Sequence, residues 1–227
     1  MRALLVLAGD PPDRAALDLA WPGWSADVGL VVAADAGAET AERLGALPDL
    51  VVGDLDSLTT TALARLTAAG VAFETSPVDK DESDAELAVR AALARGAAAL
   101  TIVGGFGGRP DHLLATIGIL ALPELIGVSV ELVDGATRLS LLRGPGRVTI
   151  AGRAGDLVSL LPFGPGVDGV TTAGLAWSLI DEPLPPGPSR GLSNVRVRDT
   201  AEVSVRTGLL LVIETVAMAA PSATLPG

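Results

Sequence analysis

The chain has 227 residues, of which 49% are hydrophobic and 19% are charged, and this balance excludes an intrinsically disordered protein. Its 27 acidic and 16 basic residues give a formal net charge of -11, so a basic face for nucleic acid is not expected. The absence of cysteine excludes disulfides and thiolate chemistry and is typical of a cytoplasmic protein. No apolar run reaches the roughly 18 residues that a membrane-spanning helix needs.

Short apolar runs alternate with helix-like segments over the first two-thirds of the chain. The strand-like runs are residues 3–8, 29–34, 50–52, 71–75, 100–103 and 128–133. The helix-like segments are residues 13–20, 38–44, 60–69, 84–95 and 111–122. Apolar strands separated by amphipathic helices predict an α/β domain, with a mostly parallel sheet and helices on both faces, over residues 1–134.

The pattern changes after about residue 135, where helical periodicity stops. Short β-like runs follow at residues 138–142, 147–150, 157–161, 167–172, 195–197, 201–205 and 209–215. They predict a smaller all-β, sandwich-like domain over residues 135–218. Residues 195–197 and 201–205 alternate valine with polar residues, which indicates an antiparallel hairpin. Residues 182–190 form a proline-rich loop, and residues 219–227 are expected to be a disordered tail.

Carboxylates follow nearly every predicted strand of the α/β part. They are Asp10, Asp35, Asp54, Asp56, Asp79, Asp81, Asp84 and Asp111. Ligands of such sheets bind outside the carboxyl ends of the strands, so these acids are expected to converge on one rim. Ordinary surface acids are the alternative, because the predicted helices also carry some.

The segment PDLVVGDLDSL, residues 48–58, is the strongest candidate for a cation site. If the backbone stays extended, Asp54 and Asp56 point to the same side of the strand. Two carboxylates about 4 Å apart repel by roughly 4 kcal/mol at an effective dielectric near 20, and a hard cation such as Mg²⁺ relieves this repulsion. The alternative is a simple turn, for which Asp and Ser are ordinary residues.

The segment KDESDAEL, residues 80–87, opens a predicted helix. Ser83 and Glu86 have the spacing of a capping box, and Asp84 in the first turn suits the helix dipole. Asp81 is not needed for the cap and precedes the helix where a ligand would lie. Lys80 is suited to neutralising phosphate, although charged loops of this kind are commonly just solvated.

The segment GGFGGRPDH, residues 104–112, places four glycines between a buried strand and a helix start at Pro110. The glycines are Gly104, Gly105, Gly107 and Gly108. Their backbone N–H groups can approach phosphate, and Arg109 adds a planar cation that fits phosphate oxygens. Neither a Walker A loop nor a dinucleotide fingerprint is present, and a flexible glycine turn is the alternative. His112 is the only histidine, which excludes a multi-histidine metal site.

Three residues of the β part flank the proline-rich loop: the aromatic Trp177 and the short hydrogen-bonding residues Ser193 and Asn194. Trp177 precedes the proline-rich loop and is either a core residue or a stacking platform. Ser193 and Asn194 follow that loop and begin a strand, and a turn is the alternative for both.

Taken in order, ADAGA, PDLVVGDLDSL, KDESDAEL, GGFGGRPDH, GLAWSL and SRGLSN resemble the thiamine pyrophosphokinase family over residues 30–195. The resemblance implies transfer of a pyrophosphoryl group from ATP to the hydroxyethyl group of thiamine, giving thiamine diphosphate and AMP. It also implies Mg²⁺, a thiamine-binding role for the β domain, and a homodimer. Each site of that dimer lies between the α/β domain of one subunit and the β domain of the other.

Residue roles follow from the same resemblance. Asp54, Asp56, Asp81 and Asp84 resemble the metal and catalytic cluster. Asp35, Lys80, Arg109 and Asp111 resemble the surrounding nucleotide and substrate contacts, whereas Trp177, Ser193 and Asn194 resemble the thiamine pocket. Either Asp84 or Asp111 would accept or orient the hydroxyl proton. Ser83 and Thr116 depart from the family, which often has Thr and Asn there.

Phosphoryl-type transfer needs positioning and charge neutralisation more than covalent chemistry, and the acids, Lys80 and Arg109 are suited to both. Two alternatives stay open. One is a pyrophosphokinase acting on another flat alcohol, such as a hydroxymethylpterin. The other is a non-catalytic sensor of thiamine or nucleotide.

Overall fold

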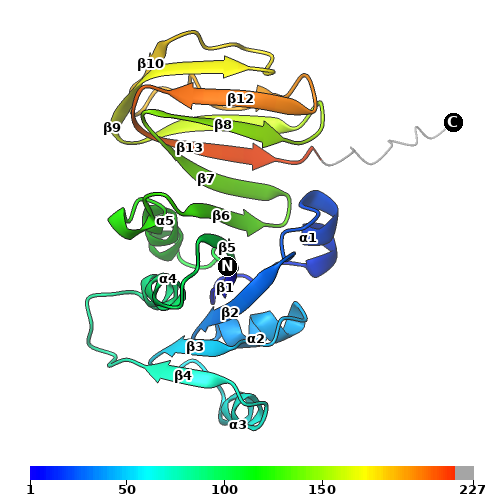
Figure 1. The fold of residues 1–227 in the computed structure, drawn as a ribbon, viewed down its shortest axis with the longest axis vertical. Helices are drawn as coiled ribbons and strands as arrows, with labels where there is room; N and C mark the ends of the chain where they lie inside the picture. The colour runs from blue at the N-terminus through cyan, green and yellow to red at the C-terminus, as the bar shows by residue number, and fades with distance from the viewer. Residues whose placement is uncertain (218–227) are drawn as a thin grey trace, which may run out of the picture. The chain divides into compact units, whose positions relative to one another are not determined.

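The structure is a computed structural model that describes residues 1–217, and the predicted disordered tail at residues 219–227 lies outside the described residues. The chain divides into two compact units, Met1–Gly135 and a second that starts at Ala136. The first contains a sheet with flanking helices, and the second consists of strands (Figure 1).

The first unit is built on a parallel sheet. Its strands lie in the order β4 (Ala72–Thr75), β3 (Leu50–Gly53), β2 (Val28–Ala34), β1 (Arg2–Val6), β5 (Ala99–Val103) and β6 (Ser129–Asp134). All neighbouring pairs are parallel. The order reverses at β1, which pairs with β2 on one side and β5 on the other. This topological switch point is where sheets of this kind bind ligands.

Figure 1 shows helices on both sides of this sheet, with α1 and α2 on one side and α4 and α5 on the other. The helices are α1 (Arg14–Ala20), α2 (Gly37–Arg43), α3 (Thr60–Ala68), α4 (Asp84–Ala94), α5 (Pro110–Ile119) and the short 3₁₀ helix η1 (Pro123–Leu125). Side-chain caps start three of them, because Asp13, Thr59 and Ser83 each accept a hydrogen bond from a first-turn N–H. The predicted cap at Ser83 is confirmed, with 3.2 Å between Glu86 N and Ser83 Oγ. The α/β alternation is also confirmed.

The second unit is all-β, as predicted. Its strands are β7 (Thr137–Arg143), β8 (Gly146–Ala151), β9 (Leu157–Ala173), β10 (Glu182–Leu184), β11 (Asn194–Val195), β12 (Thr200–Val205) and β13 (Thr207–Thr215). The long strand β9 pairs first with β11 and β13 and then with β10 and β12, so it passes from one layer of strands into another. Between the two stretches, Gly164 and Gly166 have positive φ. Buried valines and leucines of these strands form the core.

Two predictions in this unit are wrong. Residues 157–161 and 167–172 form one strand rather than two, because the glycines between them bend the chain without ending its pairing. The predicted hairpin does not form, since β11 pairs with β9 while β12 pairs with β8 and β9. Alternation identifies the buried face of a strand but not its partner. The proline-rich segment, predicted as a loop, also contains the short strand β10.

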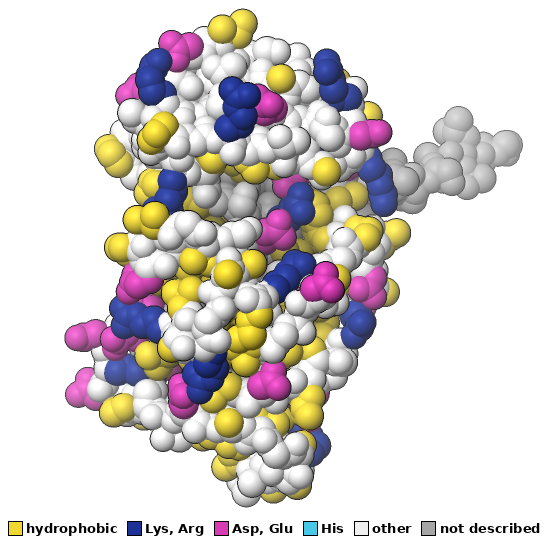
Figure 2. Space-filling view, in the orientation of Figure 1, with side chains coloured by type: hydrophobic (Ala, Val, Ile, Leu, Met, Phe, Trp, Pro, Cys, Tyr) yellow, Lys and Arg dark blue, Asp and Glu magenta, His cyan; other side chains and the backbone are white. Residues whose placement is uncertain are grey.

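On the face of the protein seen in Figure 2, acidic and basic side chains are interspersed. Among the described residues, the helices are all too short or too polar to cross a membrane.

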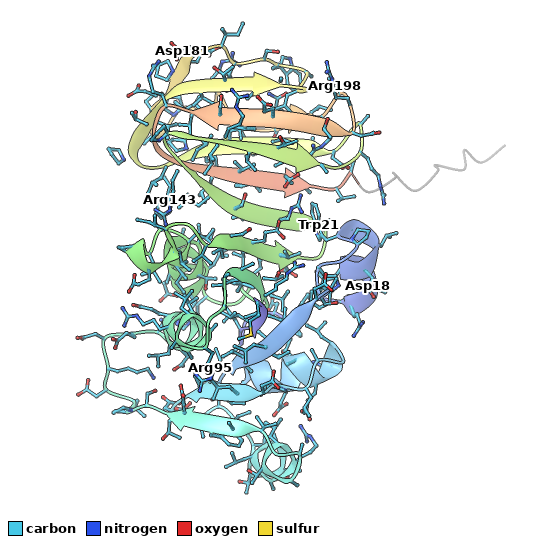
Figure 3. All side chains as sticks on the ribbon, viewed as in Figure 1. Asp18, Trp21, Arg95, Arg143, Asp181 and Arg198 are labelled. Carbon is cyan, nitrogen blue, oxygen red and sulfur yellow. The ribbon has the colours of Figure 1, made fainter. Side chains whose placement is uncertain are left out.

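Two tryptophans pack the loop after α1. Trp24 is 3% exposed and donates from Nε1 to Asp18 Oδ1 at 2.8 Å. Trp21 is 8% exposed and donates from Nε1 to the carbonyl oxygen of Gly135 at 3.1 Å. Figure 3 labels Trp21 and Asp18 at this corner of the first unit. These two buried indoles are therefore structural.

Candidate functional site

Loops at the carboxyl edge of the parallel sheet surround a cleft of about 660 Å³. Residues from the ends of β1 and β2, from the loops after β3, β4 and β5, and from α4 and α5 line it. The polar and glycine members are Gly9, Asp35, Asp54, Ser57, Lys80, Glu82, Ser83, Asp84, Gly104, Gly105, Gly107, Gly108, Arg109, His112 and Thr116. The cleft therefore lies at the topological switch point of the first unit.

The loops after β1 and β5 are joined by their backbones. Gly9 N donates to the carbonyl oxygen of Gly104 at 2.8 Å, and Asp10 N donates to that of Phe106 at 2.9 Å. A Cβ at Gly9 would lie 2.5 Å from both carbonyl oxygens, so only glycine fits there. This close approach holds the glycine loop in one conformation at the edge of the cleft.

Three carboxylates converge beside this loop. Asp35, Asp54 and Asp56 each offer an oxygen that lies within 4.8 Å of the other two. The backbone is not extended here: Leu55 has a φ of 64°, and Asp54 Oδ1 accepts a hydrogen bond from Asp56 N at 3.1 Å. This bond lowers the pKa of Asp54. The stretch is thus a turn, and the turn itself brings the two predicted acids together.

Asp35 is the buried member of the group, with 5% of its surface exposed. Its backbone is left-handed, with a φ of 47°, and its Oδ1 is buried without a hydrogen-bond partner among the described residues. Burial raises the pKa of Asp35; a hydrogen bond from Ser57 opposes this, and repulsion from Asp84, Asp54 and Asp56 adds to it. A carboxylate in this position lacks a positive partner that a cation would supply.

Asp84 lies next to the cluster and is paired with Lys80. The Lys80 Nζ to Asp84 Oδ1 distance is 2.9 Å, and the Lys80 side chain is only 12% exposed. The hydrogen bond to Asp84 raises the pKa of Lys80, and the nearby Asp54 and Asp35 act in the same direction. Lys80 is therefore a fixed positive charge at the edge of an acidic site.

Arg109 and Asp111 form an exposed pair at the start of α5. Arg109 donates from Nε and Nη2 to the two oxygens of Asp111, at 3.1 and 2.6 Å. This pairing lowers the pKa of Asp111. Arg109 lines the cleft, whereas Asp111 is not among the lining residues.

The donor set fits magnesium. Carboxylate oxygens are the ligands that hard cations prefer, and three of them are clustered here. The unpaired buried oxygen of Asp35 is a second, independent sign that a positive group belongs at this place.

The structure groups the predicted metal ligands differently from the sequence analysis. Asp54 and Asp56 are together, Asp84 is next to them, and Asp35 completes the cluster although it was assigned to the nucleotide. Asp81 is exposed and belongs neither to the cluster nor to the cleft lining. The sequence analysis named Asp10 as a rim residue but missed Leu7, Ala8 and Gly9, which line the cleft. Their signal was the AGD triplet directly after the first apolar strand.

In the second unit, Trp177 is 56% exposed although its sequence neighbours Leu175 and Leu179 are buried. Ser193 is exposed and has a left-handed backbone with a φ of 55°. Asn194 is 6% exposed, and its side-chain amide is hydrogen bonded to the backbone of Trp177. The three predicted substrate residues thus form one local group.

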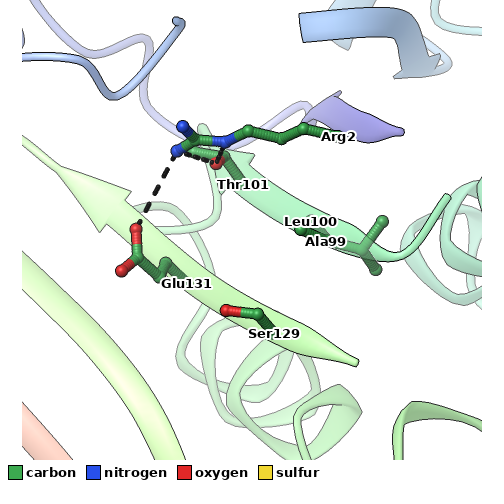
Figure 4. A pocket seen from close by; sticks show the side chains of 6 residues that line it. All are labelled: Arg2, Ala99, Leu100, Thr101, Ser129 and Glu131. Atoms are coloured by element: carbon green, nitrogen blue, oxygen red, sulfur yellow. Dashed lines mark hydrogen bonds and ion pairs between the residues drawn. The ribbon is translucent and has the colours of Figure 1, made fainter. Parts of the chain in front are cut away.

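A smaller hollow of about 260 Å³ lies at the opposite, amino-terminal ends of β1, β5 and β6. Figure 4 shows Arg2 spanning it, hydrogen bonded to Thr101 Oγ1 and 4.0 Å from Glu131 Oε2. Arg2 is already paired, and this hollow is far from the loops that carry the site chemistry.

Phosphate is the ligand that the large cleft suits best. Glycine backbones, a fixed lysine and a carboxylate cluster are brought together there, at the switch point of a parallel sheet. These features define a class of protein: a transferase of the kinase type, which moves a phosphate-containing group. Two family models make the class specific: "Thiamin pyrophosphokinase, catalytic domain" matches residues 24–129, and "Thiamin pyrophosphokinase, vitamin B1 binding domain" matches residues 147–210. The chain belongs to the thiamine pyrophosphokinase family, whose enzymes produce thiamine diphosphate.

Known relatives agree with this assignment. The thiamine pyrophosphokinase of Bacillus subtilis (strain 168) is 26% identical over 214 residues, which cover 94% of this chain and 98% of the relative. The solved thiamin pyrophosphokinase family protein of Enterococcus faecalis is 26% identical with a TM-score of 0.79, and the match covers 96% of this chain and 100% of that one. The yeast enzyme, at 18% identity, shares the fold with a TM-score of 0.75 over 94% of this chain and 86% of its own.

Proposed function

We propose that the protein transfers the pyrophosphoryl group of ATP to the hydroxyethyl group of thiamine. The hydroxyl oxygen attacks the β-phosphorus of ATP, and the bond from that phosphorus to the oxygen bridging it to the α-phosphorus breaks. AMP leaves with that oxygen, the hydroxyl proton is released, and thiamine diphosphate is formed. The observation that carries the proposal is the cluster of Asp35, Asp54 and Asp56 in a chain of this family, because two of its members, Asp35 and Asp54, line the glycine-rich cleft.

Magnesium is part of the proposal. Asp35, Asp54 and Asp56 would hold it, with Asp84 close to them. A magnesium ion held by these carboxylates would supply positive charge to the polyphosphate, as in other phosphoryl-transfer enzymes.

The chain's own residues supply the rest of the phosphate site. The backbones of Gly104, Gly105, Gly107 and Gly108 are placed to approach the polyphosphate of ATP. Lys80 adds a fixed positive charge beside them. Arg109 is paired with Asp111 but exposed to solvent, so phosphate oxygens can compete with that carboxylate for its guanidinium group.

The attacking hydroxyl group of thiamine needs to be oriented toward the phosphorus more than it needs a strong base to remove its proton. Asp84 and Asp111 are the two candidates, and each is paired with a cation. A carboxylate whose pKa is lowered, as at Asp111, accepts a hydrogen bond but takes up a proton poorly. We therefore assign this role to hydrogen bonding rather than to proton abstraction.

Trp177 and Ser193 of the second unit are proposed to contact thiamine. The exposed indole of Trp177 offers a flat face for an aminopyrimidine ring or for the thiazolium cation. A cytoplasmic location, where ATP is available, completes this assignment and agrees with the absence of cysteine.

The decisive experiment measures AMP release from ATP with magnesium, with and without thiamine, together with the thiamine diphosphate formed. Thiamine-dependent AMP with equal thiamine diphosphate supports the proposal. ADP in its place would show transfer of a single phosphate. Turnover with a hydroxymethylpterin that thiamine fails to inhibit would assign the other alcohol, and thiamine binding without either nucleotide product would indicate a sensor.

We also propose a homodimer in which each site uses the first unit of one subunit and the second unit of the other. Asp54→Asn and Trp177→Ala each remove one half of the site. The two variants are mixed, allowed to exchange subunits and assayed with thiamine below the wild-type KM, where Asp54→Asn lacks turnover and Trp177→Ala is weak. Half of the dimers are then hybrids with one intact site, and activity is expected to rise to about a quarter of the wild-type value. A site contained within one subunit, or a monomer by light scattering, gives no recovery.

A further inference from the structure

The group around Trp177 contains the only side-chain carboxamide in the sequence, that of Asn194. Asn194 is the only asparagine, and the sequence contains no glutamine. It begins β11, pairs with Val158 of β9, and is 6% exposed. A buried carboxamide needs partners for its donors and its acceptor, so what it binds indicates what it does.

The amide of Asn194 binds both backbone groups of a single residue. Trp177 N donates to Asn194 Oδ1 at 3.0 Å, and Asn194 Nδ2 donates to the carbonyl oxygen of Trp177 at 2.6 Å. Val195 N also donates to Oδ1, at 2.9 Å. The oxygen has thus accepted two hydrogen bonds and the nitrogen has used one N–H, which leaves little of this side chain for a ligand.

The segment around Trp177 is anchored on both sides of the indole. Leu175 and Leu179 are buried in the core, 4% and 1% exposed. Leu179 exchanges hydrogen bonds with Thr172, from its N–H to Oγ1 at 2.9 Å and from Thr172 N to its carbonyl oxygen at 3.0 Å. An exposed aromatic ring on a backbone fixed in this way loses little freedom when a flat ligand stacks on it.

We infer that Asn194 is a positioning residue: its amide clamps the backbone of Trp177 and so presents the indole as a stacking platform for an aromatic, cationic ligand. The inference rests on the proposed function, in which that ligand is thiamine. It revises the sequence-based assignment of Asn194 from a substrate contact to a residue that acts through Trp177.

A double-mutant cycle tests this directly. Asn194→Ala is expected to raise the KM for thiamine about ten-fold, with kcat and the KM for ATP within about two-fold of wild type. Trp177→Ala has a similar or larger effect. Because Asn194 acts through the indole, the KM of the double variant for thiamine is expected to be no higher than that of Trp177→Ala alone. Effects that multiply would show an independent contact of Asn194 with the substrate and would overturn the inference.

Two further variants sharpen the cycle. Asn194→Asp keeps the acceptor for Trp177 N, loses the donor and places a charge against a carbonyl oxygen, so its KM for thiamine is expected to rise as well. If Asn194→Ala does not fold, the cycle is run with Asn194→Asp. The matched control is Arg206→Ala, which breaks the Arg206–Asp181 pair beyond the other end of the same segment and leaves the clamp intact. Its KM for thiamine is expected to be unchanged.

A measurement of thiamine binding without ATP distinguishes failure of the proposed function from failure of the positioning role of Asn194. Quenching of Trp177 fluorescence is measured against Trp177→Phe as the blank. Wild-type protein that neither binds thiamine nor turns it over refutes the proposed function, and the inference falls with it. Wild-type protein that binds and turns over, with Asn194→Ala binding equally well, refutes the positioning role alone.

Discussion

Asp35 combines burial, a left-handed backbone and three neighbouring acids in one residue. Its folded-state pKa is raised, so the native protein binds this proton more tightly than the unfolded chain does. The stabilisation linked to the proton is present at acid pH and is lost as the pH rises through the folded pKa. At neutral pH and without metal, Asp35 therefore opposes folding.

Asp35→Asn is expected to raise the Tm of the metal-free protein at pH 7, because the amide keeps the shape and tolerates the left-handed backbone without the charge. The gain is expected to be smaller at pH 4 than at pH 7, because the raised pKa of Asp35 favours its protonated, uncharged form as the pH falls. Magnesium is expected to raise the Tm of the wild type more than that of the variant, and turnover is expected to fall by about 10²-fold or more. Differential scanning fluorimetry with EDTA or magnesium measures the first three effects. A variant with a lower Tm at both pH values would contradict this reading.

Lys80 is the only lysine of the chain, which makes its chemistry measurable by amine labelling. Its raised pKa and low exposure predict slow acylation at pH 8. Asp84→Asn removes the hydrogen bond that raises this pKa, so labelling of Lys80 is expected to become several times faster, about three- to ten-fold. Peptide mass spectrometry separates Lys80 from the N-terminal amine. Asp79→Asn in the same loop is the control, and equal rates in the two variants would show that Asp84 does not hold Lys80.

Sequence reasoning at this scale predicted that acids would gather at this edge of the sheet, but it did not predict which acids the structure brings together. Asp54 and Asp56 were paired correctly, although by a turn at Leu55 rather than by an extended strand. Asp35 was placed with the nucleotide and Asp81 with the metal. Tertiary contacts decide where the loop after β4 places Asp81 and which acids the side chain of Asp35, directly after β2, comes close to. A pattern read along the sequence does not contain these contacts.

At the scale of elements, the cleft depends on how the loops after β1 and β5 are joined. Gly9→Ala is expected to displace the glycine loop, because both close oxygens belong to the backbone and have no side-chain freedom to move aside. The expected result is a lower Tm and a KM for ATP raised about ten-fold, measured by calorimetry and steady-state kinetics.

Gly118→Ala in α5 is the matched control for this substitution. A Cβ there meets no atom within 4 Å, and the residue is helical. Alanine is therefore expected to stabilise the protein by about 0.5–1 kcal/mol, or roughly 1–4 °C in Tm, with the KM for ATP unchanged. If both variants behaved alike, the close approach at Gly9 would not control the loop.

The elements of the first unit follow from the sequence because each is a local pattern. Apolar runs, N-caps such as Ser83 and the proline at the start of α5 all act within a few residues. The second unit is less predictable because its strands pair over long separations. The glycines within β9 resembled strand ends, and the alternation of residues 195–205 resembled a hairpin, yet β11 and β12 found other partners.

At the scale of the whole molecule, the net charge of -11 sets a long-range preference for cations. Thiamine carries a positive thiazolium ring, so its encounter with the protein is favoured electrostatically. With magnesium-ATP saturating, kcat/KM for thiamine is expected to fall roughly two- to five-fold between about 50 and 300 mM salt. The kcat at saturating thiamine is expected to stay constant. A kcat/KM independent of salt would show that the net charge does not steer this substrate.

Both units place a strand from one end of the described chain in the middle of a set of strands. The first strand, β1, lies between β2 and β5, and the last, β13, lies between β7 and β9. During synthesis on the ribosome, β1 therefore waits for about a hundred residues before its second neighbour emerges, and the second unit stays open until β13 leaves the exit tunnel. A message truncated before β13 would thus yield a chain that holds every residue of the phosphate cleft but lacks a closed β unit around Trp177.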